Sequence, residues 1–124
     1  MRIESGVDAA EISRVARSME RESFVRRYFS EEEQAYFAER KMAPQTVAGH
    51  FAAKEAFSKA MGTGIRGFGL REVSILHDGL GRPYFHLAGR AAELAEGWGL
   101  SLSITHTRDT ATAFVVAWRE EEEP

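Results

Sequence analysis

The stretch Thr46–Met61 constrains the fold more than any other part of the sequence. It is rich in alanine, and its larger apolar side chains, including Phe51 and Phe57, are distributed around the whole helical circumference. A helix with apolar residues on every side has to be enclosed by other elements. We therefore predict a central helix here, ended by Gly62 and followed by a glycine-rich loop as far as Gly69.

The residues before this helix predict one strand and two further helices. Met1–Asp8 is typical of a strand that leads into a turn or a helix start. Apolar residues recur at three- and four-residue spacing from Glu11, which predicts an amphipathic helix. Ser30 and Glu33 have the spacing of a capping box, so a second helix is expected to begin there and to be stopped by Pro44.

The residues after the central helix predict a hairpin, a helix and a second pair of strands. Leu70–Leu76 and Tyr84–Leu87 flank glycine-rich turn residues and are expected to form the hairpin. Ala88–Trp98 is helical by composition and is followed by Gly99. Leu100–Thr105 and Thr110–Trp118 alternate and are expected to pair in antiparallel fashion. The predicted fold class is α+β, with helices packed on a small antiparallel sheet.

Length, net charge and composition exclude several classes of protein. The chain has 124 residues, enough for one domain, which we expect over 1–118 with an acidic C-terminal tail over 119–124. A net charge of −3 disfavours a basic nucleic-acid binder, and no apolar run approaches a spanning helix, so we expect neither nucleic acid nor membrane as a partner. The chain has no cysteine, which excludes disulfides, thiolate nucleophiles and cysteine-ligated metals, and favours a cytoplasmic protein.

A charged pair on the otherwise Ala/Phe-rich central helix carries the first chemical signal. Glu55 and Lys59 are four residues apart and therefore share one helix face. One interpretation is an exposed ion pair that stabilises the helix by roughly a few tenths of a kcal/mol. The other is a carboxylate for a hard cation and an ammonium for phosphate, beside the glycines Gly62 and Gly64 that let a phosphate approach closely.

Further motifs stand at both ends of the chain. Asp8 follows Gly6-Val7 at the end of the first predicted strand, where it could also serve only as a helix N-cap. The motifs, in chain order, are Gly-Val-Asp at 6–8, Phe-Ala-Ala-Lys-Glu-Ala-Phe-Ser-Lys-Ala at 51–60, Gly-Thr-Gly-Ile at 62–65, Gly-Arg-Pro at 81–83 and Ser-Ile-Thr-His-Thr at 103–107. Together, and over about 3–118, they resemble the holo-[acyl-carrier-protein] synthase family of 4′-phosphopantetheinyl transferases.

The resemblance implies an activity and a catalytic set. Members of this family move 4′-phosphopantetheine from coenzyme A to a serine of an apo acyl carrier protein, with Mg²⁺, and release adenosine 3′,5′-bisphosphate. By the same resemblance Asp8 and Glu55 are the metal-binding carboxylates and Lys59 lies near the coenzyme A phosphates, so these three form the expected catalytic set. The general base is either a metal-bound water relayed through Glu55 or Lys59 in its neutral form.

The resemblance also implies a coenzyme A site. The expected ligands are His50, Lys54, Lys59, Gly62, Gly64, Arg82, Pro83 and His106. His106 has an alternative role, tying a strand end to neighbouring backbone, and Gly-Arg-Pro is also ordinary turn chemistry. His50 stands where many members have arginine, and a neutral imidazole would hold a phosphate less firmly than a guanidinium does.

Partners follow from the same likeness. Half-size members of the superfamily assemble as trimers with sites between subunits, so a homotrimer is expected. Five arginines against two glutamates between Arg14 and Arg27 give a local basic surface, on which Arg14 and Arg21 are expected to dock the acyl carrier protein; a merely solvated helix face is the alternative. Two rival functions are a non-catalytic carrier-docking module of the same fold and a nucleic-acid binder using this arginine-rich segment. The class of carrier, fatty-acid or polyketide, stays open.

Overall fold

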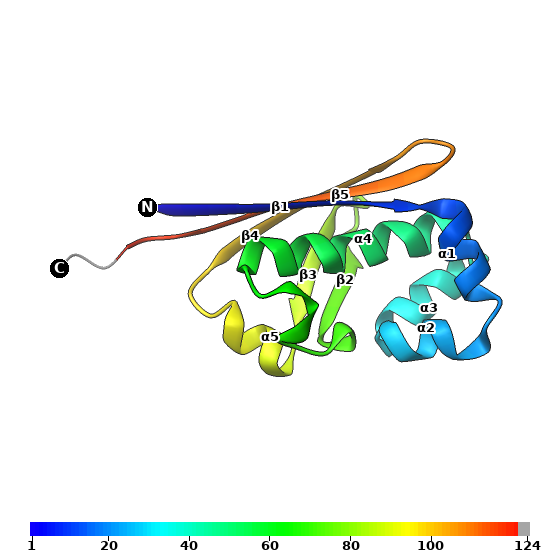
Figure 1. Ribbon diagram of the computed structural model, residues 1–124, viewed down its shortest axis with the longest axis horizontal. Helices are drawn as coiled ribbons and strands as arrows, with labels where there is room; N and C mark the ends of the chain where they lie inside the picture. Colours follow the sequence, from blue (N-terminus) through cyan, green and yellow to red (C-terminus); the bar gives the residue numbers. More distant parts are fainter. Residues whose placement is uncertain (122–124) are drawn as a thin grey trace.

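A computed structural model describes residues 1–121 and has an α+β architecture (Figure 1). Its strands are β1 (Arg2–Glu11), β2 (Val73–His77), β3 (Pro83–Leu87), β4 (Gly99–His106) and β5 (Thr110–Arg119). Its helices are α1 (Ile12–Met19), α2 (Glu22–Tyr28), α3 (Glu31–Glu39), α4 (Pro44–Met61) and α5 (Gly89–Leu94), with 3-10 turns η1 (Gly64–Arg66) and η2 (Leu70–Glu72). Among the described residues no helix is long and apolar enough to cross a membrane.

The long helix α4 runs along one face of a three-stranded antiparallel sheet of order β1-β5-β4 (Figure 1). Helices α1 to α3 lie at one end of α4, and α5 lies toward the other end. The separate hairpin β2–β3 crosses behind α4 in the view of Figure 1, and β3 lies beside β4 of this sheet. The predicted hairpin and the predicted β4–β5 pair are both confirmed.

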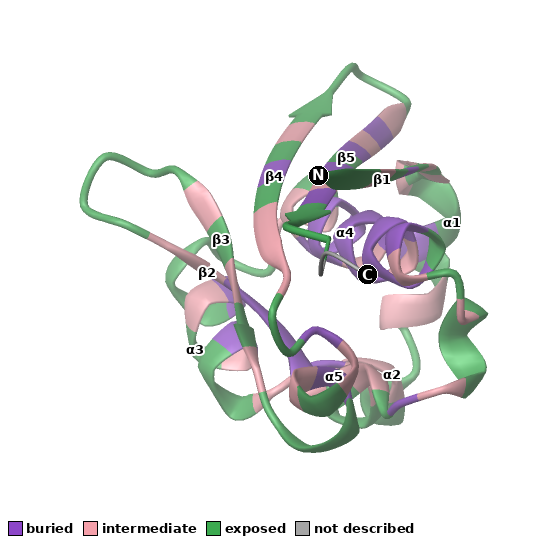
Figure 2. Cartoon of the chain, turned by 90° about the vertical axis from the view of Figure 1, so that its left-hand side faces the viewer, coloured by how far each residue is buried: buried purple, intermediate pink, exposed green. Residues whose placement is uncertain are grey.

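Burial confirms the prediction of an enclosed central helix. Eleven residues of α4 are buried, among them Ala52, Ala56 and Phe57, and the helix is drawn mostly as buried in Figure 2. Its small residues permit close approach to β1 and β5. At Gly6 on β1, a Cβ atom would lie only 2.0 Å from the carbonyl oxygen of Ala56, so glycine is required there. Close packing of β1 on α4 sets the position of the residues that follow Gly6.

Several boundaries differ from the sequence-based expectations. Pro44 begins α4 instead of stopping the preceding helix, because a proline at the first helical turn loses no hydrogen bond. Strand β1 continues to Glu11, so Asp8 lies within the strand and is not a helix N-cap. Gly99 belongs to β4, and α5 ends at Leu94.

Two further differences concern the arginine-rich segment and the C-terminus. A break at Glu20 and Arg21 separates α1 from α2, which places Arg26 and Arg27 on a different helix from Arg14. Strand β5 includes Arg119, because it pairs with Arg2 across the sheet, so the predicted tail begins after this residue. The part of the tail over 122–124 lies outside the described residues.

Candidate active site

Asp8 and Lys59 are brought together by the packing of β1 on α4. Side chains alternate along a strand, so Asp8 lies on the same face as Gly6, the face toward α4. The Lys59 Nζ atom donates hydrogen bonds to Asp8 Oδ1 at 3.1 Å and to the carbonyl oxygen of Val7 at 3.0 Å. The lysine side chain is 53% exposed, so it also remains accessible to a ligand.

Glu55 lies one turn before Lys59 and lines the same cavity as Asp8. This cavity has a volume of about 390 Å³, and Arg14, Phe24 and Phe51 also line it. Burial raises the pKa of Glu55, the negative charge of Asp8 raises it further, and Lys59 acts in the opposite direction. The two carboxylates are therefore close enough to repel each other, and a bound cation would relieve that repulsion.

Asp8 and Glu55 could supply two of the six ligands of an Mg²⁺ ion. Asp8 and Glu55 offer hard anionic oxygens, which Mg²⁺ prefers. Within residues 1–121 no group of three or more His, Cys, Asp or Glu side chains converges to hold a metal. Two carboxylates leave the other octahedral positions to water and to substrate oxygens, which is how Mg²⁺ is commonly held in phosphate-transferring sites.

An adjoining cavity carries the arginines predicted to dock the carrier protein. Its volume is about 490 Å³, and its lining includes Arg14 and Arg17 from α1, Arg21 from the break before α2, and Glu55 from α4. Arg14 lines both cavities. The arginine surface and the paired carboxylates therefore belong to one continuous region of the molecule.

The other predicted coenzyme A residues lie elsewhere. Pro83 and His106 line a third cavity of about 190 Å³ that contains neither Asp8 nor Glu55. Arg82 lines a neighbouring groove between β3 and β4, also with Pro83. The predicted site residues thus fall into two separate groups on one chain. The Asp8 group consists of Asp8, Glu55 and Lys59, and the His106 group consists of Arg82, Pro83 and His106.

Gly62 and Gly64 lie in the loop that follows Lys59. Both have positive φ angles, 73° and 61°, which favour glycine, and a Cβ atom at either position would meet nothing within 4 Å. The loop backbone at these two glycines is therefore open to an approaching ligand.

The structure contradicts the prediction that Lys54 binds coenzyme A. Its side chain is 0% exposed, and its Nζ atom donates to Glu33 Oε1 at 2.6 Å and to the carbonyl oxygens of Leu70 and Val73 at 2.8 and 2.5 Å. An ammonium group has only three donors. Lys54 is therefore a structural residue that links α4 to α3 and to the start of β2.

The prediction that His50 binds a phosphate is also wrong for this structure. The imidazole is buried, its Nδ1 atom lies 2.9 Å from Glu33 Oε2 and its Nε2 atom lies 3.0 Å from His77 Nε2. Both ring nitrogens are therefore engaged within the chain. Burial lowers the pKa of His50, and the hydrogen bond to Glu33 opposes this effect.

Glu33 and His77 are the residues that sequence reasoning missed. Glu33 does form the predicted capping box with Ser30, and that role concealed its contacts with Lys54 and His50. His77 ends β2 in an ordinary hairpin sequence. No local pattern reports a contact between residues 27 positions apart.

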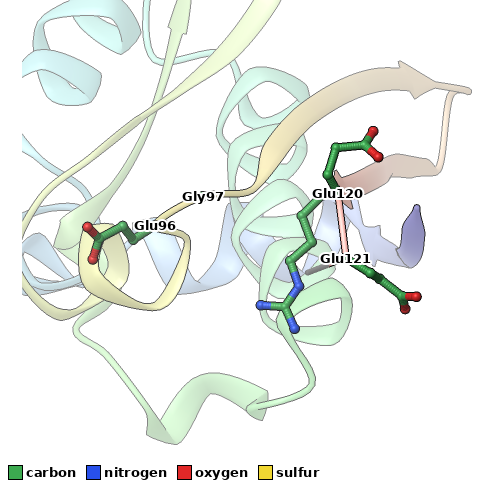
Figure 3. Close-up of a pocket in the computed structure, with 5 residues that line it drawn as sticks. Glu96, Gly97, Glu120 and Glu121 are labelled. Atoms are coloured by element: carbon green, nitrogen blue, oxygen red, sulfur yellow. The ribbon is translucent and has the colours of Figure 1, made fainter. Parts of the chain in front are cut away.

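A remaining cavity, near the end of β5, contains none of the predicted site residues. Its lining is Glu96, Gly97, Arg119, Glu120 and Glu121. Figure 3 shows the side chain of Glu96 pointing away from Glu120 and Glu121. This cavity has no convergent set of functional groups.

Comparison with known proteins identifies the family. The family model described as the 4′-phosphopantetheinyl transferase superfamily matches residues 4–118, and the chain belongs to this superfamily. Proteins named holo-[acyl-carrier-protein] synthase from Clostridium novyi and Clostridium acetobutylicum are 46% and 45% identical over 115 residues, which is 90% of this chain and 83% and 93% of theirs.

Solved structures agree with these sequence comparisons. The holo-[acyl-carrier-protein] synthase of Neisseria meningitidis superposes with a TM-score of 0.87 at 37% identity, over 94% of this chain and 98% of that one. The Helicobacter pylori enzyme in complex with coenzyme A gives 0.83 at 29% identity, over 92% and 99%. The α+β fold class and the resemblance stated from the motifs are confirmed.

Proposed function

We propose that this protein transfers 4′-phosphopantetheine from coenzyme A to a serine of an apo acyl carrier protein in an Mg²⁺-dependent reaction. The observation that carries the proposal is that Asp8 and Glu55 line one cavity, with Lys59 hydrogen-bonded to Asp8, in a member of this superfamily. In the reaction the serine oxygen bonds to the phosphorus next to the pantetheine. The bond from that phosphorus to the bridging oxygen breaks, and adenosine 3′,5′-bisphosphate leaves.

Asp8 and Glu55 would hold the ion, which supplies positive charge to the diphosphate during transfer. Lys59 is placed to add a second positive charge at the same position, because Asp8 and the Val7 carbonyl oxygen orient its ammonium group. Phosphoryl transfer depends mainly on such positioning and charge stabilisation.

The geometry supports Glu55 over Lys59 in proton transfer. Lys59 is engaged in an ion pair with Asp8, which uses the ammonium form, and an ammonium has no lone pair to accept a proton. Glu55 is half-buried, and its pKa is raised, chiefly by burial. Glu55 has lone pairs that can accept a proton and lines the same cavity as Asp8, so we assign the proton from the serine to Glu55 through water.

A homotrimer would complete the site. The face of β1 and β5 that points away from α4 leaves Ile3, Val7, Phe114 and Trp118 exposed. Ile3 pairs with Trp118 and Val7 with Phe114, so these side chains form one apolar strip across two strands. Packing of these strips between copies would bury the exposed apolar side chains, and we propose that His106 of one copy then completes the site around Asp8 of another.

The oligomer can be tested without activity. Light scattering should give the mass of three chains for the wild type, and Phe114→Glu should dissociate the assembly. Leu80→Glu, the same change at an exposed apolar residue of the β2–β3 turn, is the control and should remain trimeric. A wild type that scatters as a monomer would contradict the trimer. A cytoplasmic location stays a prediction.

The transfer itself is tested by mass spectrometry of an apo carrier protein incubated with coenzyme A, Mg²⁺ and this protein. The carrier should gain the mass of one phosphopantetheine, and it should gain nothing when Glu55→Gln replaces the wild type. Carrier binding without any gain in mass would instead establish the non-catalytic docking module.

A further inference from the structure

A chain of hydrogen bonds runs from the interior to the β2–β3 turn through two histidines. Glu33 Oε2 lies 2.9 Å from His50 Nδ1, and His50 Nε2 lies 3.0 Å from His77 Nε2. His77 Nδ1 lies 3.3 Å from the carbonyl oxygen of Gly81 in the turn. The chain therefore begins at a buried carboxylate on α3 and ends at an exposed backbone carbonyl.

The number of N–H groups decides which charge state of the two histidines allows all three hydrogen bonds to form. Both of its ends, the Glu33 carboxylate and the Gly81 carbonyl, can only accept hydrogen bonds. Each of the three contacts needs one N–H, whereas two neutral imidazoles carry only two and two imidazolium ions carry four. Three N–H groups correspond to one shared positive charge on the pair. A fourth would place two N–H groups face to face across the 3.0 Å contact.

We infer that His50 and His77 hold one shared proton, and that this proton tethers the β2–β3 turn to α4. His77 is then a positioning residue for the cavity that Pro83 and His106 line. The consequence for coenzyme A binding rests on the proposed function, whereas the sharing of the proton does not.

Hydrogen bonds within the β2–β3 turn make it move as one unit when His77 donates to the Gly81 carbonyl oxygen. Asp78 Oδ1 accepts hydrogen bonds from the backbone N–H groups of Leu80 and Arg82, both at 2.9 Å, and the Gly81 N–H donates to the Asp78 carbonyl oxygen at 2.9 Å. A pull on Gly81 is therefore transmitted to Arg82 and Pro83. Pro83 lines the cavity together with both histidines of the pair.

Stacking fixes the ring of His77. Tyr36 lies parallel to it, with ring centroids 4.2 Å apart and an interplanar angle of 7°. The Arg40 guanidinium also lies over the ring of this tyrosine, 4.7 Å from its centroid. The orientation of His77 is thus set by packing, and its protonation changes the hydrogen bonds and not the ring position.

The charged groups around the pair set the direction of its titration. Burial lowers the pKa of both histidines. Arg40 and Lys54 oppose protonation as well, while Glu33 and Asp78 favour it. Arg71 faces Lys54, and His106 lines the same cavity as the pair. The shared proton should therefore bind at a pH below the pKa of an exposed histidine.

At higher pH the neutral pair has to give up one contact. The buried Glu33 carboxylate keeps the His50 Nδ1–H, since a buried Oε2 atom left without a hydrogen bond is costly. The remaining proton serves the His50–His77 contact, and the Gly81 carbonyl turns to water, which replaces the lost bond at an exposed site. This contact is the longest of the three, consistent with its being the weakest.

Ring-nitrogen NMR of the full protein, without coenzyme A, tests the shared proton directly. Between about pH 8 and about pH 5 the pair should take up one proton in a joint step, at a pH below the ordinary histidine pKa of about 6.5. His50 Nδ1 should carry a hydrogen throughout. Independent titration of His50 and His77, each near the ordinary histidine pKa of about 6.5, would overturn the inference.

Coenzyme A kinetics test the positioning role. His77→Phe keeps the stack on Tyr36 but has no ring nitrogen, and His86→Phe makes the same change at an exposed residue of the same hairpin. In each protein the KM for coenzyme A is measured at about pH 6 and about pH 8. The ratio of these two KM values should be about five times larger in the wild type and in His86→Phe than in His77→Phe. Because any titration of coenzyme A itself affects all three proteins equally, it cancels in this comparison.

Two outcomes separate the inference from the proposed function. The pH effect in the wild type should appear in KM and not in kcat at saturating coenzyme A, and His77→Gln, which hydrogen-bonds without titrating, should lose the pH dependence of KM just as His77→Phe does. Identical pH profiles in His77→Phe and the wild type would overturn the positioning role. Failure of the wild type to bind coenzyme A would overturn the proposed function and that consequence, while the NMR result would still decide the shared proton.

Discussion

The Nζ atom of Lys54 lies 2.6 Å from Oε1 of Glu33, and both side chains are completely buried. Five residues further along α4, Lys59 pairs with Asp8 at 3.1 Å with half of its side chain exposed. One helix therefore carries two lysine–carboxylate pairs of similar chemistry in opposite surroundings.

These two pairs predict opposite mutational effects. Lys54→Met should lower the free energy of unfolding by about 3–5 kcal/mol, because it leaves Glu33 as an uncompensated buried charge. Lys59→Met should cost less than about 1 kcal/mol, because its pair is solvent-exposed, but should abolish transfer. Urea unfolding and the transfer assay measure the two quantities. Equal stability losses would contradict the assignment of separate roles.

The carboxylates at the cavity predict loss of metal-dependent activity without loss of fold. Asp8→Asn and Glu55→Gln each remove one anionic oxygen ligand at nearly constant shape. Both variants should melt within a few degrees of the wild type but show no transfer across a Mg²⁺ titration. Removal of the metal with a chelator should silence the wild type in the same way. Near-wild-type rates in both variants would refute the metal assignment.

The arginine surface predicts a defect specific to the carrier protein. Arg14→Glu combined with Arg21→Glu should strongly raise the KM for the carrier, leave the KM for coenzyme A nearly unchanged and weaken the salt dependence of the rate. Arg26→Glu combined with Arg27→Glu makes the same charge change on α2 and should have little effect. A carrier KM that responds equally to both pairs would indicate only a general change in net charge.

The contact between β1 and α4 predicts a large cost for one methyl group. Gly6→Ala places a Cβ atom against the backbone of Ala56 and should destabilise the protein by about 2 kcal/mol or more. Gly79→Ala adds the same atom where nothing lies within 4 Å and should be nearly neutral. Thermal unfolding of the two variants compares the effects, and an equally stable Gly6→Ala would disprove the close approach.

Glu33 predicts how stability changes in acid. Burial alone would raise the pKa of its carboxyl, but the hydrogen bond from His50 and the charge of Lys54 overcome this and lower the pKa below 4.5. A carboxyl with a lowered pKa in the folded state contributes stability above its unfolded pKa and loses it as the pH falls through the folded one. Stability should therefore decline below about pH 4.5, measured by urea unfolding. In Glu33→Gln this part of the decline should be missing.

Local patterns in the sequence were sufficient for most of the secondary structure. The enclosed helix was predicted from apolar residues around its circumference, and the β4–β5 pair from alternation in two neighbouring stretches. The start of that helix was misjudged because Pro44 is compatible both with ending one helix and with beginning the next. The motifs that carry the family resemblance are local as well, and they placed Asp8, Glu55 and Lys59 among the functional residues.

The roles of the charged residues on α4 were decided only by the tertiary structure. Lys54 and Lys59 stand on one helix and belong to one motif, so nothing in their sequence surroundings distinguishes a buried structural ammonium from an accessible one. The difference arises because Glu33 and the start of β2 cover one side of α4, whereas Asp8 on β1 approaches the other. The sequence by itself determined the elements and the residue types of the site. Burial and partners depend on contacts between distant segments, and these formed only when the chain folded.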